Sequence, residues 1–493
     1  MDVMEAGVAD AATIAKYEPV IGLEVHVQLG TRTKIFCGCS TEFGNPPNTQ
    51  TCPVCLGLPG ALPVLNRQAV TLAVRASLAL NCQVRSFSRF ARKNYFYPDL
   101  PKGYQISQYD QPVAEHGWIE VVLEDGTTKR IGITRLHLED DAGKNSHEGF
   151  PDSGRYSYVD LNRTGVPLAE IVSEPDLRSA DEAFAYLTEL KQIMQFVGVS
   201  DCDMEKGQLR CDANVSVRLK GAEKFGTKAE VKNLNSFRFA KLAIEYEIAR
   251  QVAVLEAGGV IPQETRLYNT VTGETVTMRS KEEAHDYRYF PEPDLMPLVI
   301  GDEWREEIER AMPELPAAKR QRFIGVYGLS EYDARVLSST QLLADYFEAA
   351  AKASGDPKIA ANWVQGELAG ALNTTGKTIA DSPVSAARLA ELVKLVADGT
   401  LSGKLGKDVF AKMFASGKTA AEIVEAEGLK QISDTGALQK IIDDVLAKNA
   451  GQVATYKGGK TSVLGFFVGQ VMKATRGQAN PQAVNDLLKK ALE

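Results

Sequence analysis

The chain has 493 residues, of which 44% are hydrophobic and 24% are charged, as in a soluble globular protein of roughly three domains. Its net charge of −8 argues against a protein that coats nucleic acid indiscriminately. The first 17 residues carry three acidic side chains and one lysine, which excludes a secretory signal or an arginine-rich transit peptide. No apolar run is long enough to span a bilayer, so we expect a cytoplasmic protein without a membrane partner.

The first predicted element is a strand at residues 21–29, where polar and apolar side chains alternate strictly. This alternation places Glu24, His26 and Gln28 on one face and aliphatic residues on the other. A carboxylate and an imidazole two residues apart on a rigid backbone offer two ligands to a divalent cation. An ordinary amphipathic strand explains the same pattern, so other carboxylates must converge on this face before it indicates a metal site.

Four cysteines follow in a loop at residues 37–55. Cys37 and Cys39 are separated from Cys52 and Cys55 by twelve residues that are rich in turn formers. Two close thiolate pairs at this spacing predict a tetrahedral, structural zinc site. Disulfides are the alternative, but a long chain with no export signal is expected in a reducing compartment.

The region up to about residue 298 has the pattern of an α+β domain with a mixed or antiparallel sheet. Alternating segments on either side of the turn at 124–126 predict a hairpin. Periodicity of 3.6 residues predicts helices at 68–80, 180–197 and 239–255.

Several of the predicted strands in this region carry charged faces. Alternation places His137, Glu139 and Asp141 on one face, while Glu170 stands alone in an apolar run and needs a partner, because an unpaired buried carboxylate is costly. Another predicted strand segment, at 204–218, has polar side chains at its even positions from 206 onward. Together these faces fit a cradle for Mg²⁺ and a polyphosphate, and a salt-bridged sheet face is the alternative.

Residues 299–428 show helical periodicity with glycine and proline punctuation, which predicts an all-α domain. A last helical segment is expected to begin near Ser433, with helices at 436–448 and 481–492. Residues 448–493 carry a net charge of +5, which fits one focused contact with a phosphate backbone or, equally, a solvated helical surface.

Motifs that together span most of the chain resemble the family of aminoacyl-tRNA amidotransferase B subunits, GatB of the GatCAB complex. They lie at residues 21–26, 92–99, 103–108, 137–144, 159–163, 209–216, 231–236, 286–294, 468–473 and 477–482. The resemblance implies a cradle domain of glutamine-synthetase-like fold at 1–298, a helical domain at 299–428 and a YqeY-like, tRNA-binding tail domain at 429–493.

The resemblance also implies a reaction. ATP would phosphorylate the side-chain carboxylate of glutamate or aspartate misacylated onto tRNA(Gln) or tRNA(Asn), and ammonia would then displace phosphate to form the amide. The ammonia would come from glutamine hydrolysed by the partner GatA in a heterotrimer with GatC, in agreement with the lack of a Gly-x-Ser-x-Gly nucleophile motif in this chain. The alternative is a non-catalytic, zinc-stabilised RNA-binding scaffold, which would gain nothing from an acidic concavity.

Residue roles are carried over from the family by position. The implied catalytic residues and magnesium ligands are Glu24, His26, Glu139 and Glu170. The implied contacts to phosphate and acceptor are Lys93, Arg210 and Lys232. The four cysteines, Cys37, Cys39, Cys52 and Cys55, match the members of the family that bind zinc, where the metal supports a loop.

Overall fold

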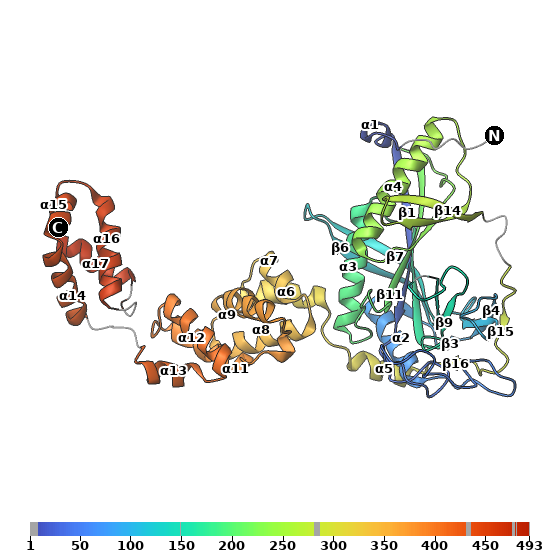
Figure 1. The fold of residues 1–493 in the computed structure, drawn as a ribbon, viewed down its shortest axis with the longest axis horizontal. Coiled ribbons are helices and arrows are strands. Elements are labelled where there is room, and N and C mark those ends of the chain that lie inside the picture. Colours follow the sequence, from blue (N-terminus) through green and yellow to red (C-terminus); the bar gives the residue numbers. More distant parts are fainter. Residues whose placement is uncertain are drawn as a thin grey trace. The chain divides into compact units, whose positions relative to one another are not determined.

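The computed structural model describes residues 8–147, 149–280, 286–429, 435–475, 479 and 481–492. The chain forms two compact units, Met1–Leu315 and Pro316–Glu493 (Figure 1). The division into three domains at 298 and 428 remains a prediction.

A nine-stranded sheet is the centre of the first unit, and its strand order is β14-β13-β12-β11-β1-β10-β7-β6-β2. The strands are β1 (Tyr17–Gln28), β2 (Gln83–Val84), β6 (Ala114–Val122), β7 (Thr128–Asp140), β10 (Pro167–Ser173), β11 (Leu209–Leu219), β12 (Ala229–Lys232), β13 (Glu264–Asn269) and β14 (Glu274–Ser280). Among the described residues of this sheet, β12 and β13 run parallel and the other neighbours antiparallel. The α+β class with a mixed sheet is therefore confirmed, as is the hairpin, formed by β6 and β7.

The strand predicted at 21–29 is confirmed as β1, in the middle of the sheet between β10 and β11. It begins four residues earlier than predicted, because Tyr17 to Val20 continue the pairing with β11. Its odd-numbered residues from Ile21 to Val27 are fully buried.

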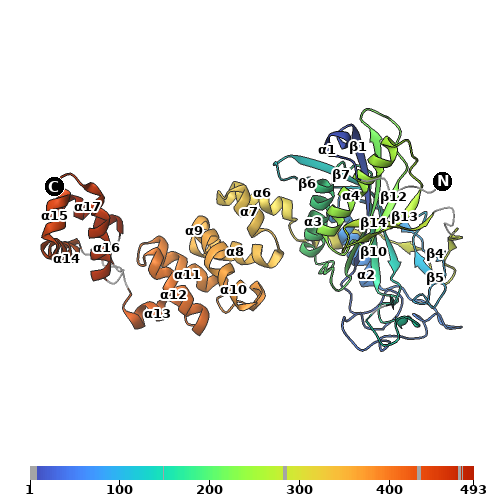
Figure 2. The ribbon, with the colours of Figure 1, turned by 45° about the horizontal axis from the view of Figure 1, so that its top comes forward.

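Helices α2 (Arg67–Ala79), α3 (Ala180–Phe196) and α4 (Phe237–Glu256) confirm the three helices predicted in this region to within two residues at each end. The side chains of Asn66, Ser179 and Ser236 cap their N-termini by accepting backbone N–H groups. Figure 2 shows α3 and α4 together along the sheet, and both pack on its apolar face.

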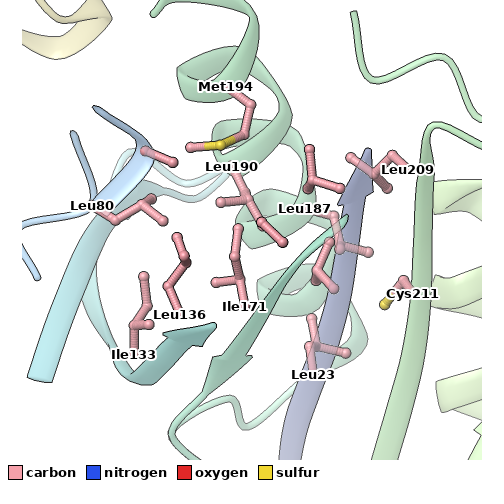
Figure 3. Packing of buried hydrophobic residues seen from close by; sticks show 14 of the residues in the cluster. Leu23, Leu80, Ile133, Leu136, Ile171, Leu187, Leu190, Met194, Leu209 and Cys211 are labelled. Atoms are coloured by element: carbon pink, nitrogen blue, oxygen red, sulfur yellow. The ribbon is translucent and has the colours of Figure 1, made fainter. Parts of the chain in front are cut away.

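The core of the first unit lies between these helices and the sheet. Figure 3 shows Leu187, Leu190 and Met194 of α3 over aliphatic side chains of the central strands, among them Leu23, Leu136 and Ile171. Because successive strand residues point to opposite faces, burying this face leaves the alternate residues of the same strands on the other.

Three small sheets flank the large one. They pair β15 (Phe290–Pro291) and β5 (Tyr104–Ser107) with β4 (Ala91–Asn94), β16 (Leu298–Val299) with β3 (Phe87–Ser88), and β8 (Lys144–Ser146) with β9 (Tyr158–Asp160). Strand β5 is attached to the end of β7 by Asp140, whose Oδ1 accepts the N–H of Ile106 at 2.7 Å. Short helices α1 (Ala11–Ile14) and α5 (Asp302–Arg310) complete the unit, and Trp304 of α5 lies under the guanidinium of Arg67 at 4.3 Å.

Among its described residues the second unit contains helices joined by loops and no β-strand. Its helices are α6 (Pro316–Tyr327), α7 (Glu331–Leu337), α8 (Gln341–Ser354), α9 (Pro357–Trp363), α10 (Ala369–Thr375), α11 (Ala386–Ala397), α12 (Gly403–Ser416), α13 (Ala420–Glu427), α14 (Thr435–Lys448), α15 (Ala450–Lys457), α16 (Leu464–Ala474) and α17 (Pro481–Leu492). Helices α14, α16 and α17 enclose a separate apolar core around Ile442, Phe467 and Leu488.

The helices predicted at 436–448 and 481–492 are confirmed as α14 and α17. The predicted start near Ser433 and part of the motif at 477–482 lie outside the described residues. Among the described helices, none combines the length and the apolar character needed to cross a membrane.

Candidate active site

A single row of polar side chains crosses the four central strands on the face opposite the core. In the strand register, His137 of β7 lies opposite Glu170 of β10, Glu170 lies opposite His26 of β1, and His26 lies opposite Arg210 of β11. Directly paired residues point to the same face, so these four side chains stand side by side. Glu139, two residues beyond His137 on β7, stands on this face in the next row.

His26, Glu139 and Glu170 form a group that could hold a metal ion. The Nε2 atom of His26 lies 3.3 Å from Oε2 of Glu170 and 3.8 Å from Oε1 of Glu139, and the three ligand atoms all lie within 4.8 Å of one another. Ligands that bind one ion at about 2–2.5 Å are separated by roughly 3–5 Å, so the group has the required spacing.

His137, which was not among the predicted site residues, completes the cluster. Its Nε2 atom lies 3.4 Å from Oε2 of Glu170 and 3.9 Å from Oε2 of Glu139. Its Nδ1 atom lies 3.4 Å from Nε of Arg135, so Nε2 is the ring nitrogen that faces the carboxylates. His137 therefore contacts Glu170 directly and stands beside Glu139. Its position in the sequence, two residues before Glu139, does not reveal the contact with Glu170.

The titration of this cluster follows from its burial and its charges. Burial disfavours the charged form of His26, but the hydrogen bond and charge of Glu170, together with the charge of Glu139, raise the pKa of this imidazole above its ordinary value. Burial also opposes ionisation of Glu170, yet His137 and His26 hold the pKa of its carboxyl well below the usual range. Glu170 is therefore a carboxylate at neutral pH.

Glu24 lies one row away from this group. It stands opposite Asp212 in the pairing with β11, and its Oε1 atom accepts a hydrogen bond from Nδ2 of Asn214 at 2.9 Å. The structure thus brings together three of the four predicted magnesium ligands and keeps the fourth beside them on the same strand face.

A cavity of about 600 Å³ opens over this face of the sheet. All seven predicted residues of the magnesium and phosphate sites line it: Glu24, His26, Lys93, Glu139, Glu170, Arg210 and Lys232. The cavity therefore combines an acidic floor with several cations, which suits a polyanion bound through a metal.

Two of the three predicted cations are engaged in ion pairs. Nη2 of Arg210 lies 2.8 Å from both carboxylate oxygens of buried Asp141, and Nζ of Lys232 lies 2.7 Å from Asp212 and 3.0 Å from Glu230. The charge of Asp141 raises the pKa of Arg210. These two cations thus hold the acidic walls of the cavity in place.

Lys93 is differently placed. Burial lowers the pKa of its ammonium group, but the charges of Glu139 and its neighbours more than offset this and raise it, so Lys93 is charged at neutral pH. Within the described part of the chain it forms no ion pair closer than 4 Å, and its Nζ lies 5.1 Å from the centre of the Tyr287 ring. It is therefore available to an anionic substrate.

One side of the cavity is a tyrosine wall, consisting of Tyr95, Tyr109, Tyr287 and Tyr289. These residues were not predicted as site residues. Tyr287 and Tyr289 belong to segment 286–294, which was noted only as a family motif, and nothing in the local pattern indicates that this segment returns to the residues around Lys93.

Segment 286–294 is fastened to β4 by the two residues on either side of Lys93. The Arg92 guanidinium donates to both oxygens of buried Glu292, at 2.7 and 2.8 Å. Asn94 Nδ2 donates to the carbonyl oxygens of Tyr287 and Arg288, at 3.1 and 2.9 Å. One short strand thus supplies a cation to the cavity and holds the tyrosine wall beside it.

The four cysteines predicted to bind zinc lie together, and their sulfur atoms are within 4.8 Å of one another. The Sγ atoms of Cys52 and Cys55 are 3.8 Å apart, the separation expected of tetrahedral ligands at about 2.3 Å from one ion and far longer than a disulfide bond of about 2.05 Å. A hydrogen bond from Cys37, one from the N–H of Cys52 and the charge of Lys34 lower the pKa of Cys55 to about 4. The cluster can therefore hold a soft metal cation through thiolate sulfur.

Comparison with known families defines first the class of protein to which this fold and site belong. Residues 19–306 match the model of the GatB/GatE catalytic domain, and residues 345–492 match that of the GatB domain. The first match contains all the residues of the cavity described above and all of the central sheet except Tyr17 and Glu18.

The relatives then identify the particular family. The chain is 60% identical over 478 residues to the B subunit of the aspartyl/glutamyl-tRNA(Asn/Gln) amidotransferase of Geotalea daltonii, covering 97% of this chain and 100% of that protein. The proteins of the same name from Syntrophotalea carbinolica and Persephonella marina are each 58% identical, over 97% of this chain and 99% and 100% of their own lengths. The chain belongs to the family of tRNA-dependent amidotransferase B subunits, which confirms the resemblance and favours an enzyme over the non-catalytic scaffold.

Proposed function

We propose that this protein activates and amidates the side-chain carboxylate of glutamate or aspartate misacylated onto tRNA(Gln) or tRNA(Asn). ATP transfers its γ-phosphoryl group to the carboxylate oxygen, giving an acyl phosphate and ADP. Ammonia then attacks the acyl carbon, phosphate leaves, and the amide remains. The observation that carries this proposal is the group of His26, Glu139 and Glu170 on the floor of a cavity lined with cations.

The donor atoms of this group fit a magnesium ion. Glu139 and Glu170 supply the carboxylate oxygens that Mg²⁺ prefers, His26 stands beside them, and the side that faces the cavity leaves room for water and phosphate oxygens. Glu24, one row away, could support the ion through water. When bound, the metal would neutralise charge that develops on the phosphate oxygens during transfer.

The protein groups around this floor supply positioning and charge. Lys93 offers its ammonium group to the oxygens of the transferred phosphoryl group, where a fixed cation stabilises charge in the transition state. Arg210 and Lys232 keep Asp141 and Asp212 in place along the wall, so that the acceptor meets a fixed surface.

We further propose the assembly that this chemistry needs. Ammonia is produced from glutamine by GatA, in a GatCAB heterotrimer with GatC. The basic tail domain contacts tRNA, the cradle has a glutamine-synthetase-like fold, and the four-cysteine loop binds a structural zinc ion. The complex acts in the cytoplasm, where misacylated tRNA is available.

The test uses the reconstituted GatCAB complex with misacylated tRNA, ATP and glutamine. Glu170→Ala and His26→Ala should abolish tRNA-dependent ATP hydrolysis and amide formation while glutamine hydrolysis by GatA remains detectable. Glu120→Gln, on an exposed position of β6, is the matched control and should leave all three activities unchanged. If either cavity variant amidated tRNA at the wild-type rate, the proposed site would be wrong.

A further inference from the structure

The outermost ring of the tyrosine wall is an open stacking surface. Tyr109 and Tyr289 are stacked with their ring centres 4.2 Å apart and their planes inclined by 10°. One face of the Tyr109 ring is therefore covered by Tyr289, yet the residue is 62% exposed. Tyr109 thus presents an aromatic surface to solvent at the rim of the cavity.

The ring beneath Tyr109 is held in place. Tyr289 contacts Tyr287 edge to face at 6.0 Å, and Tyr287 contacts Tyr95 in the same way at 6.0 Å. Arg288, between the two tyrosines, has a left-handed backbone with φ of 44°, a conformation that non-glycine residues rarely adopt. Asn94, which donates to the carbonyl of Arg288, and Asp286, which accepts its N–H at 3.0 Å, maintain this conformation. The surface under Tyr109 is therefore ordered before any ligand binds.

A fixed aromatic ring with an open face suits an unpaired nucleobase. Bases stack on tyrosine whatever their identity, because every base has a planar π face. The reaction proposed above brings two nucleobases to this cavity, the adenine of ATP and the terminal base of the tRNA.

The position of Tyr109 discriminates between these two bases. A cavity of about 600 Å³ admits a small molecule such as ATP but excludes the body of a tRNA, so the tRNA must remain outside and insert only its aminoacylated end. The terminal nucleotide, which carries the ester, must then lie where the tRNA end crosses the rim of the cavity. The open face of the Tyr109 ring lies at this rim.

We propose that Tyr109, supported by Tyr289, forms a stacking subsite for the unpaired 3′-terminal base of the aminoacyl-tRNA. This inference rests on the proposed function, since it assigns that substrate a contact at the same cavity. The subsite holds the terminal nucleotide so that the esterified side chain extends toward the acidic floor.

The experiment measures binding of uncharged tRNA(Gln) transcripts, with and without the 3′-terminal adenosine, to the full GatCAB complex. Because it requires no turnover, its outcome is independent of whether the complex proves to amidate tRNA. We compare wild type with Tyr109→Ala, Tyr109→Phe, which keeps the ring, and Tyr332→Ala, which removes an equally exposed tyrosine from α7.

For wild type, removing the terminal adenosine should weaken binding about 5- to 150-fold, the range measured for one base stacked on an aromatic side chain. Tyr109→Ala should weaken binding of the intact tRNA to the same extent. In this variant, removal of the terminal adenosine should have no further effect on affinity, because the two changes remove the same contact. Tyr109→Phe and Tyr332→Ala should bind intact tRNA like wild type, and the Kd for ATP should not change in any variant.

Three results would overturn the subsite. Additive effects of the two changes would mean that Tyr109 and the terminal base do not meet. A Tyr109→Phe variant as weak as Tyr109→Ala would assign the effect to the hydroxyl group instead of the ring. A weaker affinity for ATP, with unchanged affinity for tRNA, would mean that the adenine of ATP stacks there.

Discussion

The ion pair between Arg92 and Glu292 offers the most direct test of how the cavity wall is held. The Glu292 side chain is fully buried and accepts two hydrogen bonds from the Arg92 guanidinium and a third from the N–H of Asp294 at 3.0 Å. Nη2 of Arg92 also lies 3.0 Å from Oδ2 of Asp294. Arg92→Met removes the cation and leaves the carboxylate buried without it. We expect segment 286–294 to open more readily, because an uncompensated buried charge is expensive.

The size of the effect follows from that geometry. Breaking a buried, hydrogen-bonded ion pair from one side costs about 3–5 kcal/mol, which corresponds to about a 10²- to 10⁴-fold increase in the population of the open segment. Replacing both partners, as Arg92→Met with Glu292→Met, should restore most of this loss, because no charge then remains buried.

The assay is hydrogen exchange of the amide of Glu292, whose N–H donates to the carbonyl of Phe90 at 2.9 Å and is exposed only when the segment opens. Local exchange suits this question better than global unfolding, since a chain of two compact units need not unfold in one step. If Arg92→Met left exchange at Glu292 unchanged, or if the double variant exchanged faster than the single one, this ion pair would not be what holds the wall.

Three further predictions follow from the described contacts. Lys93→Met should lower kcat for amide formation about 10²- to 10³-fold in steady-state assays, because it removes the fixed positive charge that acts on the transferred group. Lys93→Arg keeps this charge and should retain more activity. Equal losses of kcat in the two variants would refute the role of the charge. Cys52→Ser should lower the zinc content measured by elemental analysis and lower Tm. Cys82→Ala, at a buried cysteine outside the cluster, should keep the metal. Zinc retained by Cys52→Ser would count against the site. The carboxyl of Glu348 has a pKa lowered from 4.5 to about 2, mainly by its hydrogen bonds with Arg322, so its ionisation stabilises the fold above pH 4.5 and this contribution is lost as the pH falls from 4.5 towards 2. Glu348→Gln should therefore lower Tm at pH 7, with a difference from wild type that shrinks over that interval, and a constant difference in calorimetry would contradict the assignment.

What the sequence predicted well was local. The alternation in β1 was enough to place Glu24 and His26 on one face, because side-chain direction in a strand depends only on the parity of the residue number. The cysteine cluster was predicted equally directly, since the ligand pairs lie in one loop and their spacing limits the geometry.

What the sequence could not supply was the pairing of distant segments. Which residues stand opposite His26 depends on the order and register of the strands. From the sequence alone, the convergence of Glu139 and Glu170 on His26 was therefore a hypothesis. The contact of His137 with Glu170 depends on the pairing of β7 with β10, and the tyrosine wall depends on a contact between residues almost 200 positions apart.

The alternation of β1 has a consequence for the fidelity of folding. Ile21, Leu23, Val25 and Val27 are fully buried on one face, and Glu24 and His26, which lie between them, line the cavity on the other. A slip of one residue would exchange the two sets and expose all four aliphatic side chains, at a cost of roughly 6–12 kcal/mol, comparable to the whole stability of a domain. Hydrophobic burial thus selects against every odd-numbered shift of β1, because such a shift would turn Glu24 and His26 away from the cavity.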